Sequence, residues 1–347
     1  MYNCNRKQQG GIKMGKEQAR KLMNGFCRVC SKCDGRGCEG EVPGMGGKGS
    51  GSSFKANYDS LRKYKLNMRV FSKIDEVDTS TKIFGKNIDL PVMAAPIGGV
   101  DFNMSEELSE IEYLNSVARG SKKAGTIVSA GDGVRKYVLD AGIKAANRYP
   151  DSVIPFLKPW AEKTLREKLK KLKKETNVTT IGMDVDTIGL ATINLMGKNI
   201  KPRPAKQVMD IISDYSFNFI MKGIMTVEEA QEAVEAGVDA IYVSNHGGRV
   251  LDHTPGVAKV LPEIVKKVGD QVTILADGGI RSGIDVLKMI ALGADAVLIG
   301  RPVAISAFSD LENGVEDYFN NIKEELANAM LLTGCSNISE IDKNIIY

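Results

Sequence analysis

Short apolar runs alternate with helix-like segments along the chain from residue 90 onward. The segments between the runs have helical periodicity, and 226–236 and 282–292 are two examples. In the first, Thr226 and Glu229 fit a capping box, and Gly237 stands where it would end the helix. We expect the runs to be buried β-strands, and there are eight of them, at 90–95, 126–129, 153–157, 180–184, 217–222, 240–244, 272–276 and 296–299.

Eight strand–helix repeats predict a closed parallel barrel, the TIM (β/α)8 fold. An open doubly wound sheet is the alternative, but no convincing glycine-rich loop follows the first predicted strand. The start of the chain differs, because Lys and Arg are frequent up to residue 36 and glycine is dense over 35–51. We therefore predict a Cys/Gly-rich N-terminal extension, 1–55, and a barrel, 56–347. Such an extension is flexible or is organised by a ligand.

Composition narrows the function classes. The 347 residues are 43% hydrophobic and 26% charged, and their net charge of +4 is too small to argue for nucleic-acid binding. The Lys-rich segment 162–176 carries Leu165, Leu169 and Leu172 on one face, so we interpret it as a solvated barrel helix rather than a nucleic-acid surface. No apolar run approaches the ~20 residues that span a membrane. The N-terminus has no apolar signal core, so we expect a cytoplasmic protein.

Polar residues follow several of the predicted strands, where a (β/α)8 barrel builds its active site. Lys222 ends the fifth run, His246 follows the sixth and Asp277 follows the seventh. The loops after the last two strands often bind phosphate in such barrels. Backbone N–H groups and guanidinium groups there would be the donors, and they belong to Gly278, Gly279, Gly300, Arg281 and Arg301.

Four segments together resemble the FMN-dependent 2-hydroxy acid oxidase family, which includes glycolate oxidase, lactate oxidase and flavocytochrome lactate dehydrogenase. They are Phe219-Ile220-Met221-Lys222-Gly223, Ser244-Asn245-His246-Gly247-Gly248-Arg249-Val250-Leu251-Asp252, Asp277-Gly278-Gly279-Ile280-Arg281 and Gly300-Arg301-Pro302. The likeness extends to Leu332-Thr333-Gly334-Cys335 and, less closely, to 53–133, and it is poor over 136–216.

The resemblance implies an FMN-dependent oxidoreductase that oxidises a small anionic (S)-2-hydroxy acid, with L-lactate as the first candidate. His246 would take a proton from the substrate, because imidazole exchanges protons near neutral pH. Asp186 would orient the histidine, and Arg249 would bind the substrate carboxylate. The residues implied to bind FMN are Pro96, Ile97, Gly98, Ser129, Lys222, Ser244, Asp277, Gly278, Gly279, Arg281, Gly300 and Arg301. Family members of this kind often form homo-oligomers, which we expect here.

The sequence also departs from the family pattern. The stretch 38–53 lacks the tyrosine that meets the substrate, and Leu157-Lys158-Pro159 stands where a second tyrosine is usual. A second arginine is missing from 187–190, and Asp184 replaces a threonine. Replacement charge could come from Lys158, Lys198, Lys201 or Arg203. Two alternatives therefore stay open: an FMN enzyme without net oxidation, such as an isomerase of similar fold, and a non-catalytic flavin or metal protein that senses redox state.

Four of the six cysteines cluster near the N-terminus, as Cys27, Cys30, Cys33 and Cys38. Without an export signal, the cluster is better explained by a metal or redox site than by disulfides. Four thiolates at this spacing suit an iron–sulfur cluster, and half of a chaperone-type zinc module has a similar pattern. Free thiols are the remaining alternative. An iron–sulfur cluster beside the flavin would pass electrons to an electron-acceptor partner.

Overall fold

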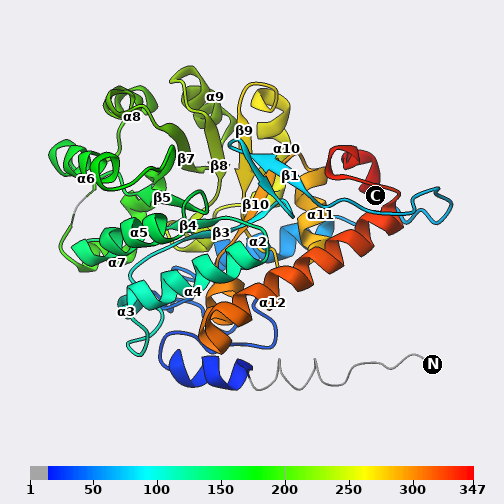
Figure 1. Ribbon diagram of the computed structural model, residues 1–347, viewed down its shortest axis with the longest axis horizontal. Coiled ribbons are helices and arrows are strands. Elements are labelled where there is room, and N and C mark those ends of the chain that lie inside the picture. Colours follow the sequence, from blue (N-terminus) through cyan, green and yellow to red (C-terminus); the bar gives the residue numbers. More distant parts are fainter. Residues whose placement is uncertain (1–14, 199) are drawn as a thin grey trace.

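The computed structural model describes residues 15–198 and 200–347, so the first part of the predicted extension and Asn199 lie outside the described residues. The described residues form a closed barrel of parallel strands (Figure 1). Around the barrel the strands follow the order β10-β3-β4-β5-β6-β7-β8-β9. Their bounds are β3 Val92–Ile97, β4 Val128–Ala130, β5 Val153–Leu157, β6 Thr180–Asp184, β7 Asn218–Ile224, β8 Ala240–Val243, β9 Thr273–Ala276 and β10 Ala296–Ile299.

Each predicted apolar run overlaps one of these strands, and the pairing of β10 with β3 closes the sheet. The predicted barrel is therefore confirmed, and the open sheet is wrong. The runs are continuous rather than alternating because parallel strands are covered on both faces. Every residue of β5, β6, β8 and β10 is buried.

The barrel interior is a packed core that a short hairpin closes at one end. The antiparallel strands β1 (Thr81–Ile83) and β2 (Lys86–Ile88) place Ile83 and Ile88 in the same apolar cluster as interior side chains of the barrel. Within that cluster the rings of Phe156 and Tyr242 meet edge to face, with centroids 6.2 Å apart. The active site must therefore lie at the opposite, C-terminal end of the strands.

Helices surround the barrel (Figure 1). Predicted helix 162–176 is α6, whose buried residues are Leu165, Leu169 and Leu172, as the solvated-helix interpretation requires. Thr226 accepts a hydrogen bond from the Glu229 amide at the start of α9. The helices are α2 Ser52–Lys63, α3 Val100–Asn103, α4 Glu110–Lys123, α5 Lys136–Arg148, α6 Glu162–Glu175, α7 Ala191–Leu195, α8 Ala205–Ile212, α9 Val227–Glu235, α10 Val257–Val268, α11 Gly283–Ala291 and α12 Arg301–Thr333, the last interrupted at Asp310 and Leu311. Short 3-10 turns are η1 Val185–Gly189, η2 Ser213–Tyr215, η3 His246–Gly248, η4 Ile338–Glu340 and η5 Lys343–Ile345.

The segment before α2 crosses the C-terminal end of the barrel. Lys48 donates from its amide to the Gly248 carbonyl and from Nζ to the carbonyls of Gly189 (2.9 Å) and Val250 (2.7 Å). The Ser50 amide donates to Asp252 over 2.6 Å. Glycine-rich chain with few apolar side chains is thus fixed by polar contacts to the loops after β6 and β8. Across residues 15–198 and 200–347, the helices are all too short or too polar to cross a membrane.

Candidate active site

One large cavity opens at the C-terminal ends of the barrel strands. Twelve of the residues that the resemblance implicates line it: Pro96, Ile97, Gly98, Lys222, His246, Arg249, Asp277, Gly278, Gly279, Arg281, Gly300 and Arg301. Ser129, Asp186 and Ser244 lie behind the lining, and Asp186 and Ser244 contact His246. Residues separated by up to two hundred positions therefore converge on a single site.

A buried network of ion pairs forms one side of the cavity. The Lys222 Nζ atom on β7 lies 3.0 Å from Asp184 Oδ1 and 3.8 Å from Asp186 Oδ2. Burial by itself lowers the pKa of Lys222, but the carboxylates of Asp184, Asp186 and Asp277 outweigh it and raise the pKa above the ordinary lysine value. Burial by itself would raise the pKa of Asp186. The positive charge of Lys222 and the contact with His246 outweigh burial, so the net effect is a lowered pKa. The Lys222 ammonium and the Asp186 carboxylate are therefore both favoured in their charged forms.

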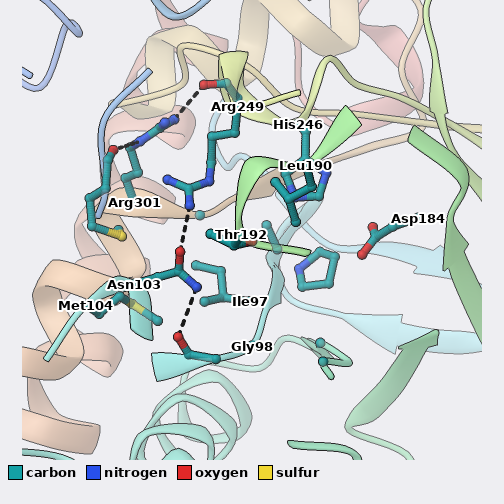
Figure 2. Close-up of a pocket in the computed structure, with 18 of the residues that line it drawn as sticks. Ile97, Gly98, Asn103, Met104, Asp184, Leu190, Thr192, His246, Arg249 and Arg301 are labelled. Carbon is teal, nitrogen blue, oxygen red and sulfur yellow. Dashed lines mark hydrogen bonds between the residues drawn. The ribbon is translucent and has the colours of Figure 1, made fainter. Parts of the chain in front are cut away.

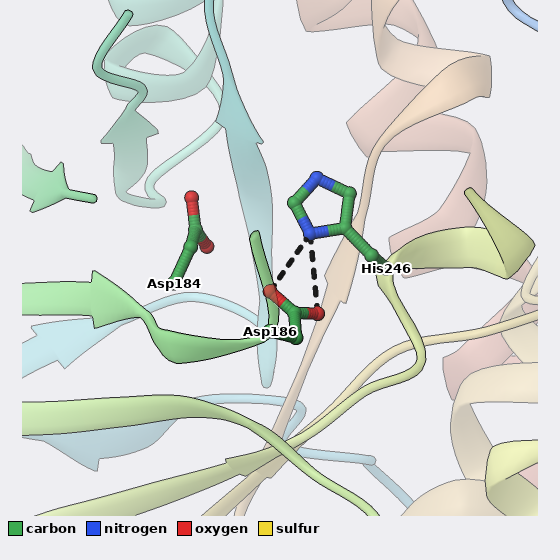
Figure 3. A group of neighbouring side chains, drawn as sticks. All are labelled: Asp184, Asp186 and His246. Atoms are coloured by element: carbon green, nitrogen blue, oxygen red, sulfur yellow. Dashed lines mark hydrogen bonds and ion pairs between the residues drawn. The ribbon is translucent and has the colours of Figure 1, made fainter. Parts of the chain in front are cut away.

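His246 is held in one orientation beside this network. Its Nδ1 atom lies 3.0 and 3.2 Å from the two carboxylate oxygens of Asp186 (Figure 3) and 3.1 Å from Lys222 Nζ. The backbone at His246 is left-handed (φ 56°), and its amide donates to Ser244 Oγ over 3.0 Å. With its proton on Nδ1, His246 donates to Asp186, while the Lys222 ammonium keeps its ion pair with Asp184. This tautomer leaves Nε2 with a free lone pair.

Asp277 follows β9 and accepts two hydrogen bonds through Oδ2, each of 2.9 Å, from Tyr242 and Ser244. Its Oδ1 atom is buried and has no hydrogen-bond partner among the described residues. Burial raises the pKa of Asp277, although Lys222 opposes the shift. A buried carboxylate oxygen without a donor is costly, so this atom is suited to a donor group on a ligand.

Two of the departures from the family pattern meet in space. Lys158 Nζ lies 3.7 Å from Asp184 Oδ2, and both side chains are buried. Asp132 accepts hydrogen bonds from the Lys158 amide (3.3 Å) and from the Trp160 indole (2.6 Å), which fixes the chain at the end of β5. Of the proposed sources of replacement charge, Lys158 lines the cavity. The other three do not: Lys198 and Lys201 are exposed, and Arg203 donates to the carbonyls of Pro159 and Trp160.

The opposite side of the cavity carries Arg249 and Arg301 (Figure 2). Arg249 donates to the Gly44 carbonyl and to Asn103 Oδ1 (2.9 Å). Arg301 donates to the carbonyls of Met45, Gly46 and Gly247 over 2.6, 2.9 and 3.0 Å. Within residues 15–198 and 200–347, neither guanidinium has a carboxylate partner.

Burial and mutual repulsion act on these guanidinium groups. Burial, followed by the charge of Arg301, lowers the pKa of Arg249 to about 9, and burial lowers the pKa of Arg301. Asn103, which links Arg249 to the Gly99 carbonyl at 3.0 Å, was not found from the sequence. No local motif could reveal it, because Asn103 and Arg249 are 146 positions apart.

The glycine turn after β9 gives the cavity a wall without side chains. Gly278 and Gly279 have left-handed backbones (φ 92° and 82°), and a Cβ at Gly279 would lie 2.3 Å from the Asn57 carbonyl oxygen. Arg281 lines the cavity here and donates to the Cys33 carbonyl over 2.9 Å. With Gly300 and Arg301 at the start of α12, these groups offer amides and positive charge to a phosphate.

The residues present fit FMN. Buried Asp277 Oδ1 lacks a donor, which a ribityl hydroxyl would supply, and Ser129 Oγ on β4 is also buried without a partner among the described residues. The glycine walls at 278–279 and 300 let a phosphate approach the backbone, with Arg281 and Arg301 beside them. Lys222 would supply a buried positive charge to the ring system.

A metal ion at the network is a poorer fit. Asp184, Asp186 and His246 each place a potential ligand atom within 4.8 Å of the others (Figure 3). The Lys222 ammonium already lies beside these ligand atoms, with Nζ 3.0 Å from Asp184 Oδ1 and 3.1 Å from His246 Nδ1. A second cation would repel the ammonium at this short distance.

The predicted cysteine ligands do not enter the active-site cavity. Cys27, Cys30, Cys33 and Cys38 line a second, smaller cavity, which lies between the N-terminal segment and α12. None of them is in a disulfide.

Comparison with known proteins agrees with this geometry. A model of the FMN-dependent dehydrogenase family matches residues 44–194 and 190–347, which includes the region where the sequence resemblance was poor. A peroxisomal (S)-2-hydroxyacid oxidase of Arabidopsis thaliana is 31% identical over 335 residues, covering 86% of this chain and 89% of that protein. An L-lactate dehydrogenase of Pseudomonas syringae is 30% identical over 349 residues, covering 87% and 92%.

Solved structures give the same result. A mandelate oxidase variant with a monooxide FMN adduct is 30% identical, has a TM-score of 0.72, and covers 89% of this chain and 96% of its own. Mandelate oxidase with (S)-2-phenylpropionate has a TM-score of 0.76 at 26% identity, and each chain is covered to 97%. A flavocytochrome b2 variant with pyruvate bound, at 24% identity, shares the fold with a TM-score of 0.73.

Proposed function

Since the chain belongs to the FMN-dependent dehydrogenase family of 2-hydroxyacid oxidases and dehydrogenases, we propose that it oxidises a small (S)-2-hydroxy acid such as L-lactate to the 2-oxo acid. One observation carries the proposal. His246, oriented by Asp186 at 3.0 Å, lines the same cavity as Arg249, whose guanidinium has no carboxylate partner among the described residues. A base and an anion-binding group thus lie together where the family oxidises hydroxy acids.

His246 acts as the base in this proposal. Its Nδ1 is engaged by Asp186, so Nε2 is the nitrogen available to take a proton from the substrate. The carboxylate of Asp186 and the fixed backbone at His246 keep the ring in position, and the negative charge of Asp186 stabilises the imidazolium that forms. The positive charge of Lys222 offsets part of that negative charge, so the carboxylates of the network do not stand uncompensated.

Arg249 binds the substrate carboxylate. A planar guanidinium matches a carboxylate in a two-point contact, and such charge-assisted hydrogen bonds are strong. Lys158 lines the cavity where the family has a tyrosine, and it offers a second positive charge after partial release from Asp184. Lys158 therefore replaces the positive charge of the missing second arginine, and the substrate meets fewer tyrosine hydroxyl groups than is usual in this family.

The chain holds FMN through the residues that the resemblance implicates. Asp277 would accept a hydrogen bond from the ribityl chain, Lys222 and Ser129 would lie at the ring, and Gly278–Arg281 with Gly300 and Arg301 would hold the phosphate. When bound, FMN accepts the two electrons that leave C2 as the hydroxy acid becomes a 2-oxo acid. The protein positions the substrate and moves its proton.

The test is anaerobic reduction of the bound flavin by defined hydroxy acids. Protein purified without oxygen is mixed with L-lactate, glycolate or (S)-mandelate, and D-lactate serves as the stereochemical control. We expect the flavin absorption to bleach with one or more of the first three and the matching 2-oxo acid to appear in equal amount. Flavin bands that persist with all of them contradict the proposal.

The two histidines provide a matched pair of variants. His246→Asn should keep FMN bound and lower the rate of flavin reduction by about 10²- to 10⁴-fold, the usual contribution of general-base catalysis. His253→Asn changes an exposed loop histidine and should leave the rate unchanged. Equal rates in the two variants would remove His246 from the mechanism.

A further inference from the structure

The four clustered cysteines surround one cavity. Cys27, Cys30, Cys33 and Cys38 all line it, and the other walls come from the surrounding segment and from α12. All four thiols are free, although they lie on a segment of twelve residues. Residues 27–38 precede residue 44, where the family match begins, so the four cysteines lie outside the matched residues.

The spacing of the sulfur atoms distinguishes between metals. A tetrahedral zinc ion with Zn–S bonds of about 2.3 Å holds its sulfurs about 3.8 Å apart. Over residues 15–198 and 200–347, the Asp184–Asp186–His246 group has three ligand atoms within 4.8 Å of one another, and no three of the four cysteines do. The sulfurs surround the cavity more widely than one zinc ion requires, as they would around a polynuclear cluster.

The charges around the cavity suit an anionic occupant. Arg28, Lys32 and Arg301 line it together with one acid, Asp34. Arg281 Nη2 also donates to Cys33 Sγ over 3.5 Å. A cluster held by four thiolates carries net negative charge, and nearby cations and hydrogen bonds to the sulfurs stabilise it and raise its reduction potential.

The cysteine cavity and the active-site cavity share a wall. Met45, Phe54 and Arg301 line both. The Arg301 guanidinium lies 3.7 Å above the centroid of the Phe54 ring, so the wall is one packed layer of side chains. Groups bound in the two cavities would be neighbours across this layer.

We propose that Cys27, Cys30, Cys33 and Cys38 bind an iron–sulfur cluster next to the flavin site. Its consequence for catalysis rests on the proposed function. Oxidation of a 2-hydroxy acid to a 2-oxo acid releases two electrons and two protons, and the cluster carries one electron at a time. The electrons then leave in two single steps to an external one-electron acceptor, and the protons leave to water. The protein is in this case a dehydrogenase.

Metal analysis of the full chain, purified without oxygen, decides whether the cluster exists. We expect iron and acid-labile sulfide in equal amounts, about four of each per chain for a cubane cluster, and zinc well below one equivalent. Reduction with dithionite should produce a low-temperature paramagnetic resonance signal from the cluster. One equivalent of zinc without iron, or no bound metal, overturns the proposal.

Cysteine variants assign the ligands. Cys30→Ser and Cys33→Ser should lose most of the iron, whereas Cys335→Ser, at a buried thiol remote from the cavity, should retain it. The FMN content shows whether each variant is folded. Iron retained in both Cys30→Ser and Cys33→Ser contradicts this ligand set.

A kinetic comparison separates this inference from the proposed function. In Cys30→Ser, flavin bleaching by the hydroxy acid should stay within about twofold of the unmodified protein, while turnover with ferricenium should fall at least tenfold. If iron is present but no hydroxy acid bleaches the flavin, the cluster proposal stands and the proposed function is rejected. If a hydroxy acid bleaches the flavin but no iron is present, the proposed function stands and the cluster proposal is rejected. Unchanged ferricenium turnover in Cys30→Ser would remove the cluster from the electron path.

Discussion

The two sides of the active-site cavity handle buried charge in opposite ways. On the side of β6 and β7, Lys222 is paired with Asp184 at 3.0 Å, and Asp186 engages His246 at 3.0 Å. On the other side, Arg249 and Arg301 donate to carbonyl oxygens and to Asn103, with no carboxylate partner among the described residues. The first side is nearly neutralised, and the second keeps uncompensated positive charge.

The difference distinguishes charged groups that are paired within the protein from charged groups that are free to bind a ligand. The two charges of a buried ion pair compensate each other within the protein, and removing one of them lowers the stability of the fold. A partly buried guanidinium bonded to carbonyls keeps its charge available to an incoming anion. Burial lowers the pKa values of Arg249 and Arg301, and no carboxylate partner among the described residues opposes the shift. The arginine side is therefore where anionic ligands should bind, and the carboxylate side is where proton transfer should occur.

The strongest test of this contrast is to remove the central cation of the paired side. Lys222→Met leaves Asp184, Asp186 and Asp277 without their shared ammonium, so we expect a loss of about 3–5 kcal/mol in the free energy of unfolding. Urea unfolding at neutral pH measures the change. Lys206→Met, at a surface lysine whose side chain is 84% exposed, is the control and should change stability little. Similar stabilities for both variants would contradict the pairing.

A second test uses a buried carboxylate, that of Glu110, which has no cationic partner among residues 15–198 and 200–347. Glu110 accepts hydrogen bonds from the amides of Gly99 and Val100 at 3.0 and 2.8 Å, and burial outweighs these bonds and raises its pKa to about 7. The folded state then retains the proton to higher pH than the unfolded state. This stabilisation is fully present below about pH 4.5 and is lost as the pH rises through about 7, by about 3 kcal/mol.

Glu110→Gln removes this titration. The free energy of unfolding, measured in urea from pH 4.5 to 8, should lose the component that falls with pH in the unmodified protein. Glu112→Gln, which changes an exposed acid on the same helix, should retain it. Parallel pH profiles for Glu110→Gln and the unmodified protein would show that Glu110 does not titrate in this range.

On the arginine side, the expected effect is on binding rather than on folding. Arg249→Leu loses a charge-assisted contact of about 1.5–3 kcal/mol, which corresponds to a 10- to 150-fold weaker substrate affinity. The FMN content should be unchanged, and Arg249→Lys should recover only part of the affinity because it lacks the planar fork. Titration of flavin bleaching against hydroxy acid concentration gives the values. Arg119→Leu, at an exposed arginine, is the control. Equal affinities in the two leucine variants would exclude Arg249 from substrate binding.

The smallest effect should come from the second pair on the carboxylate side. Lys158 and Asp184 are 3.7 Å apart, so we expect a coupling energy of about 1 kcal/mol in a double-mutant cycle of Lys158→Met and Asp184→Thr. The two single variants should together lose more stability than the double variant. Strictly additive losses would mean that the two departures from the family pattern are independent.

Local pattern in the sequence determined the barrel and most members of the site. Continuous apolar runs predicted all eight barrel strands, because burial on both faces leaves that signature in the chain. Lys222 and His246 could be chosen because they lie at or just after strands whose ends meet at one edge, whereas Arg249 was chosen from the family resemblance. The boundaries shifted slightly, as at β4, predicted over 126–129 and observed as Val128–Ala130.

Only the tertiary structure decided which charges meet. Lys158 and Asp184 are both unusual for the family, and closure of the barrel makes them one ion pair. The carbonyls of Gly44, Met45 and Gly46 that hold Arg249 and Arg301 come from a glycine-rich segment with no periodicity to read. The wall between the cysteine cavity and the active site combines Met45 of that segment with Phe54 of α2 and Arg301 of α12. Periodicity encodes which residues are buried, whereas the partner of a buried charge depends on contacts between distant segments, which form only when the chain closes on itself.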